Sequence, residues 1–365
     1  MIRFLHTADW QMGMRAAKFG EAGKRVREER LTAGRRVVQA ARENGVDFVL
    51  VAGDVFEDNA VERSLAQQVA DILASAPCPI YVIPGNHDPL VPGSVWEHRS
   101  WQAAKNVVIL KENAPVSAPG YTIYPCPVKE KQSGQDPTAW IAAEAGDKPR
   151  IGLAHGSVEG APIGEWDHPI SRGAGTRAGL DYLALGHWHS FGTFEDSTGA
   201  SRMAYSGTHE TTSFGERNSG NVLLVEIAEA GAAPKLTPIS TAGLRWVSLS
   251  ERIHASGDMQ AVRKRVEELP RTDSSLLQLS LSGLMVPSDQ GELERVRELA
   301  GTRFLWAQVD DSGLAPAPED ESWIEALPVG LLRDVADRIR HGDADPGVKV
   351  RALLDLYALV GETRS

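Results

Sequence analysis

Cysteine is scarce in this sequence, which has only two in 365 residues, Cys78 and Cys126. They form neither the paired spacing of a thiolate metal site nor a disulfide framework, so we expect two buried thiols in a reducing compartment. No stretch reaches the about 18 apolar residues of a membrane-spanning helix. The opening residues, Met1–His6, also lack the apolar core of a signal peptide. We therefore expect a cytoplasmic protein with no part in a membrane.

An excess of positive charge is absent as well, because 38 Lys and Arg residues face 49 Asp and Glu residues, a formal net charge of -11. A protein that holds nucleic acid on a broad basic surface needs clusters of Lys and Arg. Any contact with nucleic acid must therefore be local, assisted by metal ions or supplied by a partner. With 42% hydrophobic and 24% charged residues, the composition is that of a globular protein with a sizeable core.

The first part of the chain contains recurring apolar runs that end in polar or Gly-rich turns, a pattern that predicts buried strands. These runs are Ile2–Leu5, Phe48–Val51, Ile80–Ile83, Ile151–Ala154 and Leu183–Leu185, with further candidates at Tyr121–Tyr124, Met203–Tyr205 and Val222–Ile227. Apolar residues at helical spacing predict helices at about Gly23–Glu43 and Val61–Ala74. We expect an α/β domain over residues 1–240, with two sheets as a β-sandwich flanked by helices.

The small residues of Glu229–Pro234, followed by Ile239–Gly243, predict a domain boundary. Beyond it, strands are expected at Trp246–Leu249, Leu276–Leu281 and Phe304–Val309, and helices at Met259–Leu269 and Glu292–Leu299. This pattern predicts a small α+β capping domain over residues 241–315. A second break contains Pro316, Pro318 and the acidic run Glu319–Glu321. Two helical stretches, at about Trp323–Arg340 and Pro346–Leu359, then form a C-terminal segment over residues 316–365.

Residues of the types that bind metals follow five of the expected strands. They are Asp9 and Gln11, Asp54, Asn86 with His87 and Asp88, His155, and His187 with His189. Because loops at the carboxyl ends of strands in α/β sheets converge on one crevice, we expect these groups to meet. Each motif alone is typical of an ordinary cap or loop, and it is the ordered set that favours a site. Imidazole, carboxylate and amide oxygen suit divalent metals such as manganese or iron, while the lack of thiolates speaks against structural zinc.

This order of motifs resembles the calcineurin-like metallophosphoesterases across nearly the whole first domain, and it implies their four-layer fold. The segments Leu5–Trp10, Asp181–His189 and Tyr205–Glu216 are also similar to the SbcD-type DNA repair exonucleases. The resemblance implies a nuclease that hydrolyses DNA phosphodiester bonds, as an exonuclease, an endonuclease or both. It also implies two divalent metal ions, manganese by preference, with magnesium or iron as alternatives.

The same resemblance implies partners. Residues 241–315 would help to bind DNA, and the helices of residues 316–365 would dock on an SbcC-type ATPase with a long coiled coil. The alternative is that these helices simply pack on their own domain. The sequence leaves a homodimer open as a further assembly.

Carried over position by position, the resemblance gives each motif residue a role. Asp54 would bridge the two metals, with Asp9 and His189 on the first and Asn86, His155 and His187 on the second. His87 follows a ligand without being one, so its imidazole is expected to face the substrate and to protonate the leaving oxygen. Asp88 either orients His87 or caps the turn before Pro89.

Gln11 stands where the family has a histidine on the first metal. A glutamine carbonyl is a weaker donor than imidazole and suits harder cations, so we expect a looser first site with a changed metal preference. The alternatives are a one-metal enzyme or a catalytically silent scaffold subunit. A phosphatase or phosphodiesterase that acts on a small molecule or a phosphoprotein is the remaining enzymatic alternative.

A basic stretch runs from Lys24 to Arg36 and is interleaved with glutamates. A solvated helix face explains such a pattern. The functional alternative is a local surface that contacts phosphates beside the Asp9 loop, to which Arg15 and Lys18 would add.

Overall fold

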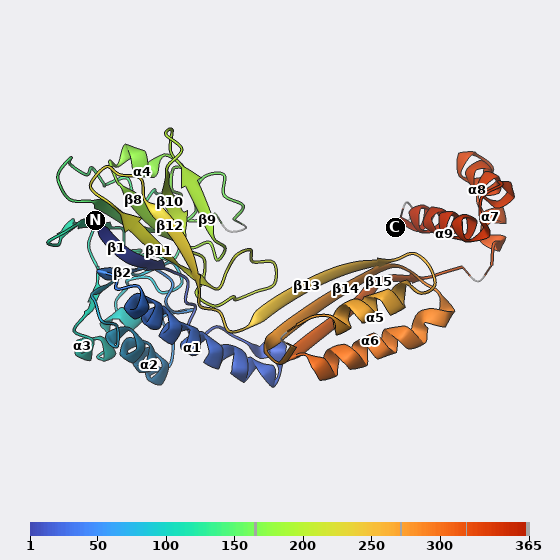
Figure 1. The fold of residues 1–365 in the computed structure, drawn as a ribbon, viewed down its shortest axis with the longest axis horizontal. Coiled ribbons are helices and arrows are strands. Elements are labelled where there is room, and N and C mark those ends of the chain that lie inside the picture. Colours follow the sequence, from blue (N-terminus) through green and yellow to red (C-terminus); the bar gives the residue numbers. More distant parts are fainter. Residues whose placement is uncertain (164–165, 271, 319, 363–365) are drawn as a thin grey trace. The chain divides into compact units, whose positions relative to one another are not determined.

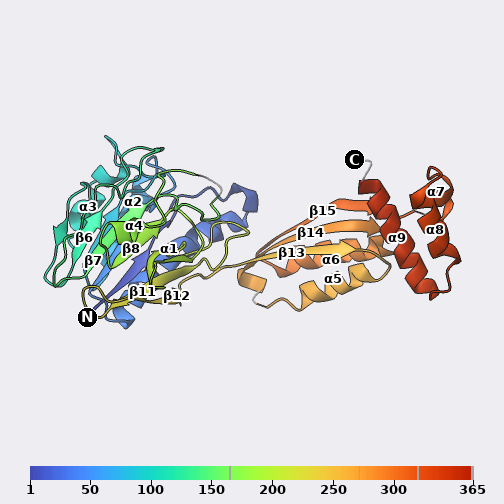
Figure 2. The same ribbon diagram turned by 90° about the horizontal axis from the view of Figure 1, so that it is seen from above.

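The computed structural model describes residues 1–163, 166–270, 272–318 and 320–362 (Figures 1 and 2). The chain divides into two compact units, Met1–Leu244 and Arg245–Ser365, called here the N-terminal and the C-terminal unit. No helix within the described ranges is long and apolar enough to cross a membrane. Both cysteines are buried and free, as expected from their spacing.

The N-terminal unit contains two six-stranded sheets. The first has the order β12-β11-β1-β2-β3-β4, and the second β5-β6-β7-β8-β10-β9. The strands of the first sheet are β1 Ile2–Thr7, β2 Phe48–Ala52, β3 Ile80–Ile83, β4 Val107–Ile109, β11 Asn221–Ile227 and β12 Lys235–Ser240. Those of the second are β5 Val116–Ser117, β6 Thr122–Pro125, β7 Arg150–His155, β8 Tyr182–Gly186, β9 Gly192–Glu195 and β10 Ser201–Tyr205. In the first sheet β1, β2, β3 and the short β4 run parallel, whereas β11 pairs antiparallel with β1 and with β12. In the second sheet β6, β7, β8 and β10 run parallel, and β5 and β9 pair antiparallel at the two edges.

Alternation along the strands explains how the two sheets stack, because successive side chains of a strand point to opposite faces. Phe4 and Phe48 face the second sheet and stack on each other with ring centroids 4.7 Å apart. Leu5 and Val49 face the opposite way, into a core with the helices. The expected two-sheet α/β fold with flanking helices is confirmed.

The helices of the N-terminal unit lie outside the sheets. Their bounds are α1 Ala22–Glu43, α2 Arg63–Ala74, α3 Ser100–Ala103 and α4 Ala174–Arg177, with 3-10 turns at Ala17–Phe19 and Val95–Glu97. Val37 of α1 and Val69 of α2 enter the core beneath the first sheet, whereas Ala174 of α4 packs on the outer face of the second. Helices α1 and α2 thus cover the outer face of the first sheet, whereas the short α4 and loop residues such as Ile141 and Ile170 cover that of the second.

Four strands were not expected from the sequence, namely β4, β5, β9 and β12. The stretch Glu229–Pro234, interpreted as part of a domain boundary, is instead the turn between β11 and β12, which pair antiparallel. Strand β12 is an edge strand with mostly exposed side chains, so it carries no apolar run that would reveal it. The units divide after this strand, between Leu244 and Arg245.

The C-terminal unit begins with three parallel strands, β13 Arg245–Ile253, β14 Ser275–Met285 and β15 Trp306–Pro316. The connecting helices α5 Asp258–Glu267 and α6 Gln290–Arg303 share a core with them, and 3-10 turns occupy Thr272–Ser274 and Pro287–Asp289. Helices that alternate with parallel strands make this an α/β module, and the expectation of an α+β module is corrected. Glu319, in the acidic run expected as a second break, lies outside the described residues.

Three helices end the chain, α7 Ser322–Glu325, α8 Leu331–His341 and α9 Pro346–Glu362. The sequence pattern predicted one continuous helix over about 323–340, and the structure corrects this. Pro328 has no backbone N–H to continue a helix, and Gly330 adopts a φ of 151°, which is outside the helical region. The three helices pack on each other through Ile324, Ala336 and Leu353.

Candidate metal centre

The predicted ligand residues follow strands of both sheets. Asp9 comes after β1, Asp54 after β2 and Asn86 after β3, all in the first sheet. In the second sheet His155 is the last residue of β7, and His187 and His189 follow β8. Strands β1, β2 and β3 are parallel, as are β7 and β8. Contacts of the His155 ring with the Ala52 carbonyl and of the His187 N–H with Asp9 Oδ1 bring the carboxyl ends of the two sets to the same edge of the sandwich.

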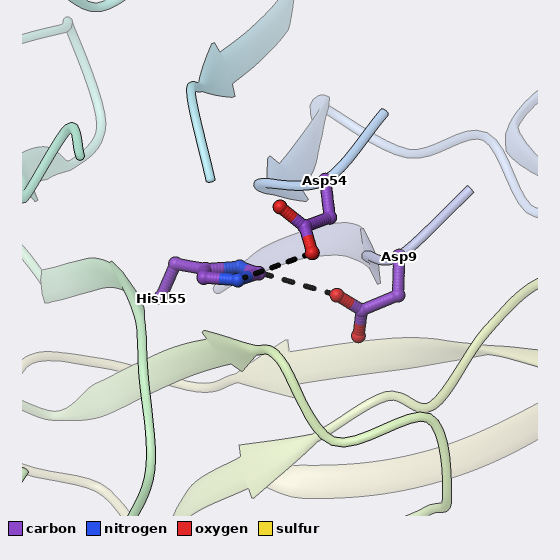
Figure 3. Close-up of side chains that lie close together, drawn as sticks. All are labelled: Asp9, Asp54 and His155. Carbon is purple, nitrogen blue, oxygen red and sulfur yellow. Dashed lines mark ion pairs between the residues drawn. The ribbon is translucent and has the colours of Figure 1, made fainter. Parts of the chain in front are cut away.

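Asp9, Asp54 and His155 form the centre of this cluster (Figure 3). Each is buried and offers one ligand atom within 4.8 Å of the others. His155 Nε2 lies 3.5 Å from Asp54 Oδ2, and His155 Nδ1 lies 3.9 Å from Asp9 Oδ1 (Figure 3). Two buried carboxylates beside one imidazole make a strong site for a cation, since buried charge is costly without compensation.

The pKa shifts of these three groups also indicate that the two buried carboxylates need a neighbouring positive charge. Burial raises the pKa of Asp9 to about 6, although His155 and His189 oppose it. Burial acts on Asp54 in the same direction, but the charge of His155 outweighs it, and the pKa of Asp54 is lowered. Burial also opposes the charged form of His155, yet the two carboxylates raise its pKa to about 9. Without a metal, the positive charge of protonated His155 offsets the negative charge of the carboxylates. A divalent cation would supply positive charge at the same place.

Asn86, His155 and His187 gather on one side of Asp54, and we call them the histidine half. Asn86 Oδ1 lies 2.7 Å from His155 Nε2 and 3.1 Å from His187 Nδ1. Atoms that bind one ion at about 2.0–2.2 Å lie about 3 Å apart, so these spacings suit a single shared cation. His155 Nδ1 faces the carbonyl of Ala52 at 2.8 Å, which turns Nε2 toward the site.

Asp9, Gln11 and His189 are the residues predicted to bind the first metal, and we call them the glutamine half. Gln11 Nε2 lies 3.1 Å from Asp54 Oδ2 and 3.4 Å from His189 Nε2. The amide end of Gln11 thus occupies the position of a ligand that shares an ion with His189 and Asp54. Gln11 Oε1 is buried without a hydrogen-bond partner, and a half-turn of the amide exchanges it with Nε2. The residues therefore fit a metal that is bound through the Gln11 carbonyl.

Backbone strain concentrates at these residues. Among the described residues other than glycine, six have a positive φ, and four of them are predicted ligands. The four are Asp9 at 53°, Gln11 at 46°, Asp54 at 52° and His187 at 113°. Such conformations cost about 1–3 kcal/mol each and persist where function requires them. The strain includes Gln11, so the loop at the substituted position is still held in a strained geometry rather than relaxed.

Two glycines let the loops approach each other closely. A Cβ atom on Gly85 would overlap the carboxylate and backbone of Asp54, and one on Gly186 would overlap the carbonyl of Ala52. Both glycines immediately precede a predicted ligand, Asn86 and His187. Any side chain at either position would push the strand ends apart and separate the ligands.

His87 lies at the mouth of the site, with its side chain about one-third exposed. Its backbone N–H donates to Asp54 Oδ1 at 2.9 Å, and its Nε2 lies 4.0 Å from Asp54 Oδ2. Its Nδ1 lies 3.0 Å from the carbonyl oxygen of Glu57. The ring is thus oriented by Glu57, a residue that the sequence did not indicate.

Asp88 was expected either to orient His87 or to cap the following turn. Its carboxylate instead accepts hydrogen bonds from the backbone N–H groups of Gly85, at 2.7 Å, and Phe56, at 2.9 Å. Burial raises the pKa of Asp88 to about 7, and the nearby charge of Asp54 adds to this shift. Asp88 therefore joins the loops after β2 and β3, and its hydrogen bonds do not lead to His87.

A cleft of about 570 Å³ opens onto the site. Its lining includes Asp54, His87, His187, Trp188 and Phe214. Lys18 is exposed, and its Nζ lies 4.9 Å from the ring centre of Phe19 and 5.9 Å from that of Phe214. Lys18 is thus close to the cleft. Arg15 is also exposed and lies on the same loop, three residues earlier.

The basic stretch of α1 divides into two kinds of residue. Lys24 and Arg25 lie within 3.7 and 3.4 Å of glutamates one turn along, as on a solvated helix face. Arg30 differs, since it is buried and donates to the carbonyl oxygens of Trp10 and Glu210. Its role is to hold two loops of the N-terminal unit together.

Glu216 and Thr212 are site residues that sequence reasoning did not single out. His189 Nδ1 lies 3.1 Å from Glu216 Oε1 and 2.9 Å from Thr212 Oγ1. Although burial opposes the charged form of each group, their mutual contact raises the pKa of His189 and lowers that of Glu216. Both residues lie in the segment Tyr205–Glu216, and the similarity of this segment to the SbcD-type nucleases was the available sequence signal.

Comparison with known proteins identifies a family that matches this chain. The sequence profile of the calcineurin-like phosphoesterases matches residues 2–191, a range that contains every predicted metal ligand. A Bacillus subtilis (strain 168) protein named uncharacterized metallophosphoesterase YhaO is 28% identical over 177 residues, 45% of this chain and 42% of that relative. The chain thus matches less than half of the relative's length. Among solved structures, the protein TT1561 of Thermus thermophilus aligns with a TM-score of 0.42 and 14% identity, covering 66% of this chain and 99% of that one.

Proposed function

The chain belongs to the calcineurin-like phosphoesterase family, and from this premise we propose that it is a metal-dependent nuclease that hydrolyses phosphodiester bonds of DNA. Phosphoester hydrolysis with divalent metals follows from the family. The observation that carries the proposal is the buried cluster of Asp9, Asp54 and His155, surrounded by further ligand types at ligand-like spacing.

In this proposal Asp54 is shared by two divalent ions, preferably manganese, with magnesium or iron as alternatives. Asn86, His155 and His187 hold one ion, and Asp9, Gln11 and His189 hold the other. Bound there, divalent metals would supply charge neutralisation for the anionic diester and would acidify a water molecule. The chain's own contribution is to hold the carboxylates close together in a buried position.

His87 is the proposed proton donor. Its side chain is partly exposed, and it lines the cleft beside Asp54. The Glu57 carbonyl accepts a hydrogen bond from Nδ1–H of His87, which leaves Nε2 as the nitrogen that would deliver a proton to the leaving oxygen. Asp88 supports this arrangement indirectly by holding the loop on which His87 sits.

A polynucleotide is the preferred substrate because of the walls of the cleft. Trp188 and Phe214 line it beside the ligand residues, and aromatic rings offer stacking surfaces to unpaired bases. Lys18 adds one local positive charge next to Phe214, which suits a chain whose net charge is -11. A stacked base and one phosphate contact favour DNA over a small phosphomonoester or a phosphoprotein.

A partner is proposed as well. Leu331 of α8 is 78% exposed, and Val348 and Leu359 of α9 are 59% and 55% exposed. These apolar side chains remain uncovered although the helices have a small core of their own. They support docking of an ATPase with a coiled coil, and thus a role in DNA repair, with residues 241–315 as an additional DNA-binding surface.

Cleavage of end-labelled linear DNA in the presence of Mn²⁺ tests the function. We expect the natural protein to cleave, and His87→Ala to lose about 10²-fold or more of the rate while still binding metal, because a general acid contributes about that much. A small activated diester serves as the control, since its leaving group needs no proton and its hydrolysis should depend less on His87. Hydrolysis of the small diester without DNA cleavage would restrict the activity to small esters. Absence of both activities would favour a noncatalytic subunit.

A further inference from the structure

His189 has a partner at each ring nitrogen. Its Nε2 faces Gln11 at 3.4 Å, and its Nδ1 faces Glu216 Oε1 at 3.1 Å and Thr212 Oγ1 at 2.9 Å. An ionised carboxylate only accepts hydrogen bonds, so contact with Glu216 places the proton of the neutral imidazole on Nδ1. The lone pair of Nε2 is then directed toward Gln11 and the metal centre.

Glu216 is itself held in place. Its Oε2 accepts the backbone N–H of Thr212 at 3.0 Å, and its Oε1 accepts hydrogen bonds from the hydroxyl groups of Thr212 and Ser213. The carboxyl side chain is only 7% exposed. A loop that wraps a carboxylate so closely presents it to His189 in one orientation, which is the requirement for a group that acts through a metal ligand.

The corresponding contact in the histidine half is weaker. His155 Nδ1 faces the neutral carbonyl of Ala52, whereas His189 Nδ1 faces a carboxylate. A carboxylate behind a ligand histidine makes the imidazole a stronger donor to the metal. The stronger support thus lies in the half that has lost an imidazole at position 11.

We propose that Glu216 is a positioning residue for His189, and that it compensates for Gln11 by strengthening the remaining imidazole of the glutamine half. This inference rests on the two-metal site proposed above. Its prediction concerns metal affinity rather than cleavage, so it stands or fails independently of the DNA substrate.

Binding of Mn²⁺ to the full chain, followed by calorimetry and by electron paramagnetic resonance, tests the proposal. We expect Glu216→Gln to weaken one of two bound ions by about 10–100-fold, the usual cost of losing the partner of a ligand histidine, and to leave the other unchanged. Gln11→His in the same chain should restore most of the lost affinity, because it returns an imidazole to that half.

Glu210→Gln is the matched control. Glu210 is a buried carboxylate of the same loop, but it accepts hydrogen bonds from the backbone of Gly243 and Leu244. This variant should alter the metal-free melting temperature without changing the affinity for either ion. The proposal is overturned if Glu216→Gln leaves both affinities unchanged, weakens both ions equally, lowers only the metal-free melting temperature, or is not rescued by Gln11→His.

Discussion

The histidine half and the glutamine half of the metal centre meet at Asp54, yet their other ligands differ in kind. One half combines two imidazoles with the amide of Asn86, whose Oδ1 lies 2.7 Å from His155 Nε2 and 3.1 Å from His187 Nδ1. The other combines one imidazole with a carboxylate and the amide of Gln11, and the Gln11–His189 spacing is 3.4 Å. Because imidazole is the stronger donor to manganese or iron, the two halves should bind their ions with unequal affinity.

The comparison also shows how a site tolerates a substituted ligand. Gln11 keeps the left-handed backbone conformation that its neighbours Asp9 and Asp54 share. Its amide stays within reach of Asp54 and His189, and Glu216 supports His189 from behind. We therefore propose that a glutamine at this position changes the donor atom and leaves the geometry around it in place.

Asp54→Asn should have the largest effect, because Asp54 is the ligand that we propose both halves share. The amide keeps the shape of the side chain but removes the charge that holds two cations together. Loss of several kcal/mol of charge stabilisation corresponds to a rate loss of about 10³-fold or more, and both ions should bind more weakly. Calorimetric titration with Mn²⁺ distinguishes this result from loss of a single ion, which would mean that the halves are independent.

Asp9→Asn should stabilise the metal-free protein. Burial raises the pKa of Asp9 from 3.8 to about 6, so the folded protein binds more protons than the unfolded chain between these values. Its stability therefore falls as the pH rises through about 6, and removing the carboxylate at pH 7 should add up to about 3 kcal/mol to the free energy of unfolding. Urea denaturation measures this difference in the free energy of unfolding. In excess Mn²⁺ the natural protein should become the more stable of the two. A wild type that is the more stable without metal would contradict the account.

Gln11→His should act on the glutamine half alone. Imidazole replaces a weaker carbonyl donor, so we expect the weaker of the two ions to bind on the order of 10-fold more tightly. The affinity of the tighter ion should not change. Equal tightening of both ions, measured by the same titration, would show that position 11 acts on the whole loop and not on one metal.

Much of this arrangement was predictable from the sequence because it depends on local patterns. The apolar run Ile80–Ile83 coincides with β3, and helical spacing placed α1 within one residue at its start. The ligand types after successive strands indicated a common site, and the structure brings them together.

The remainder depended on contacts between residues that lie far apart in the chain. Glu216 is 27 residues from His189, and no periodicity connects them. Asp88 follows His87 directly, yet its partner Phe56 is 32 residues away. Edge strand β12 is mostly exposed and so lacks an apolar pattern. Such features are decided by packing, which a single sequence does not display.

The most direct test of the two unequal halves is anomalous diffraction at the manganese edge, from crystals grown with Mn²⁺. The account predicts two ions that share Asp54, one bound by Asn86, His155 and His187, and the other by Asp9, His189 and the carbonyl oxygen of Gln11. A single ion, or a second ion that leaves Gln11 and His189 uncoordinated, would contradict it.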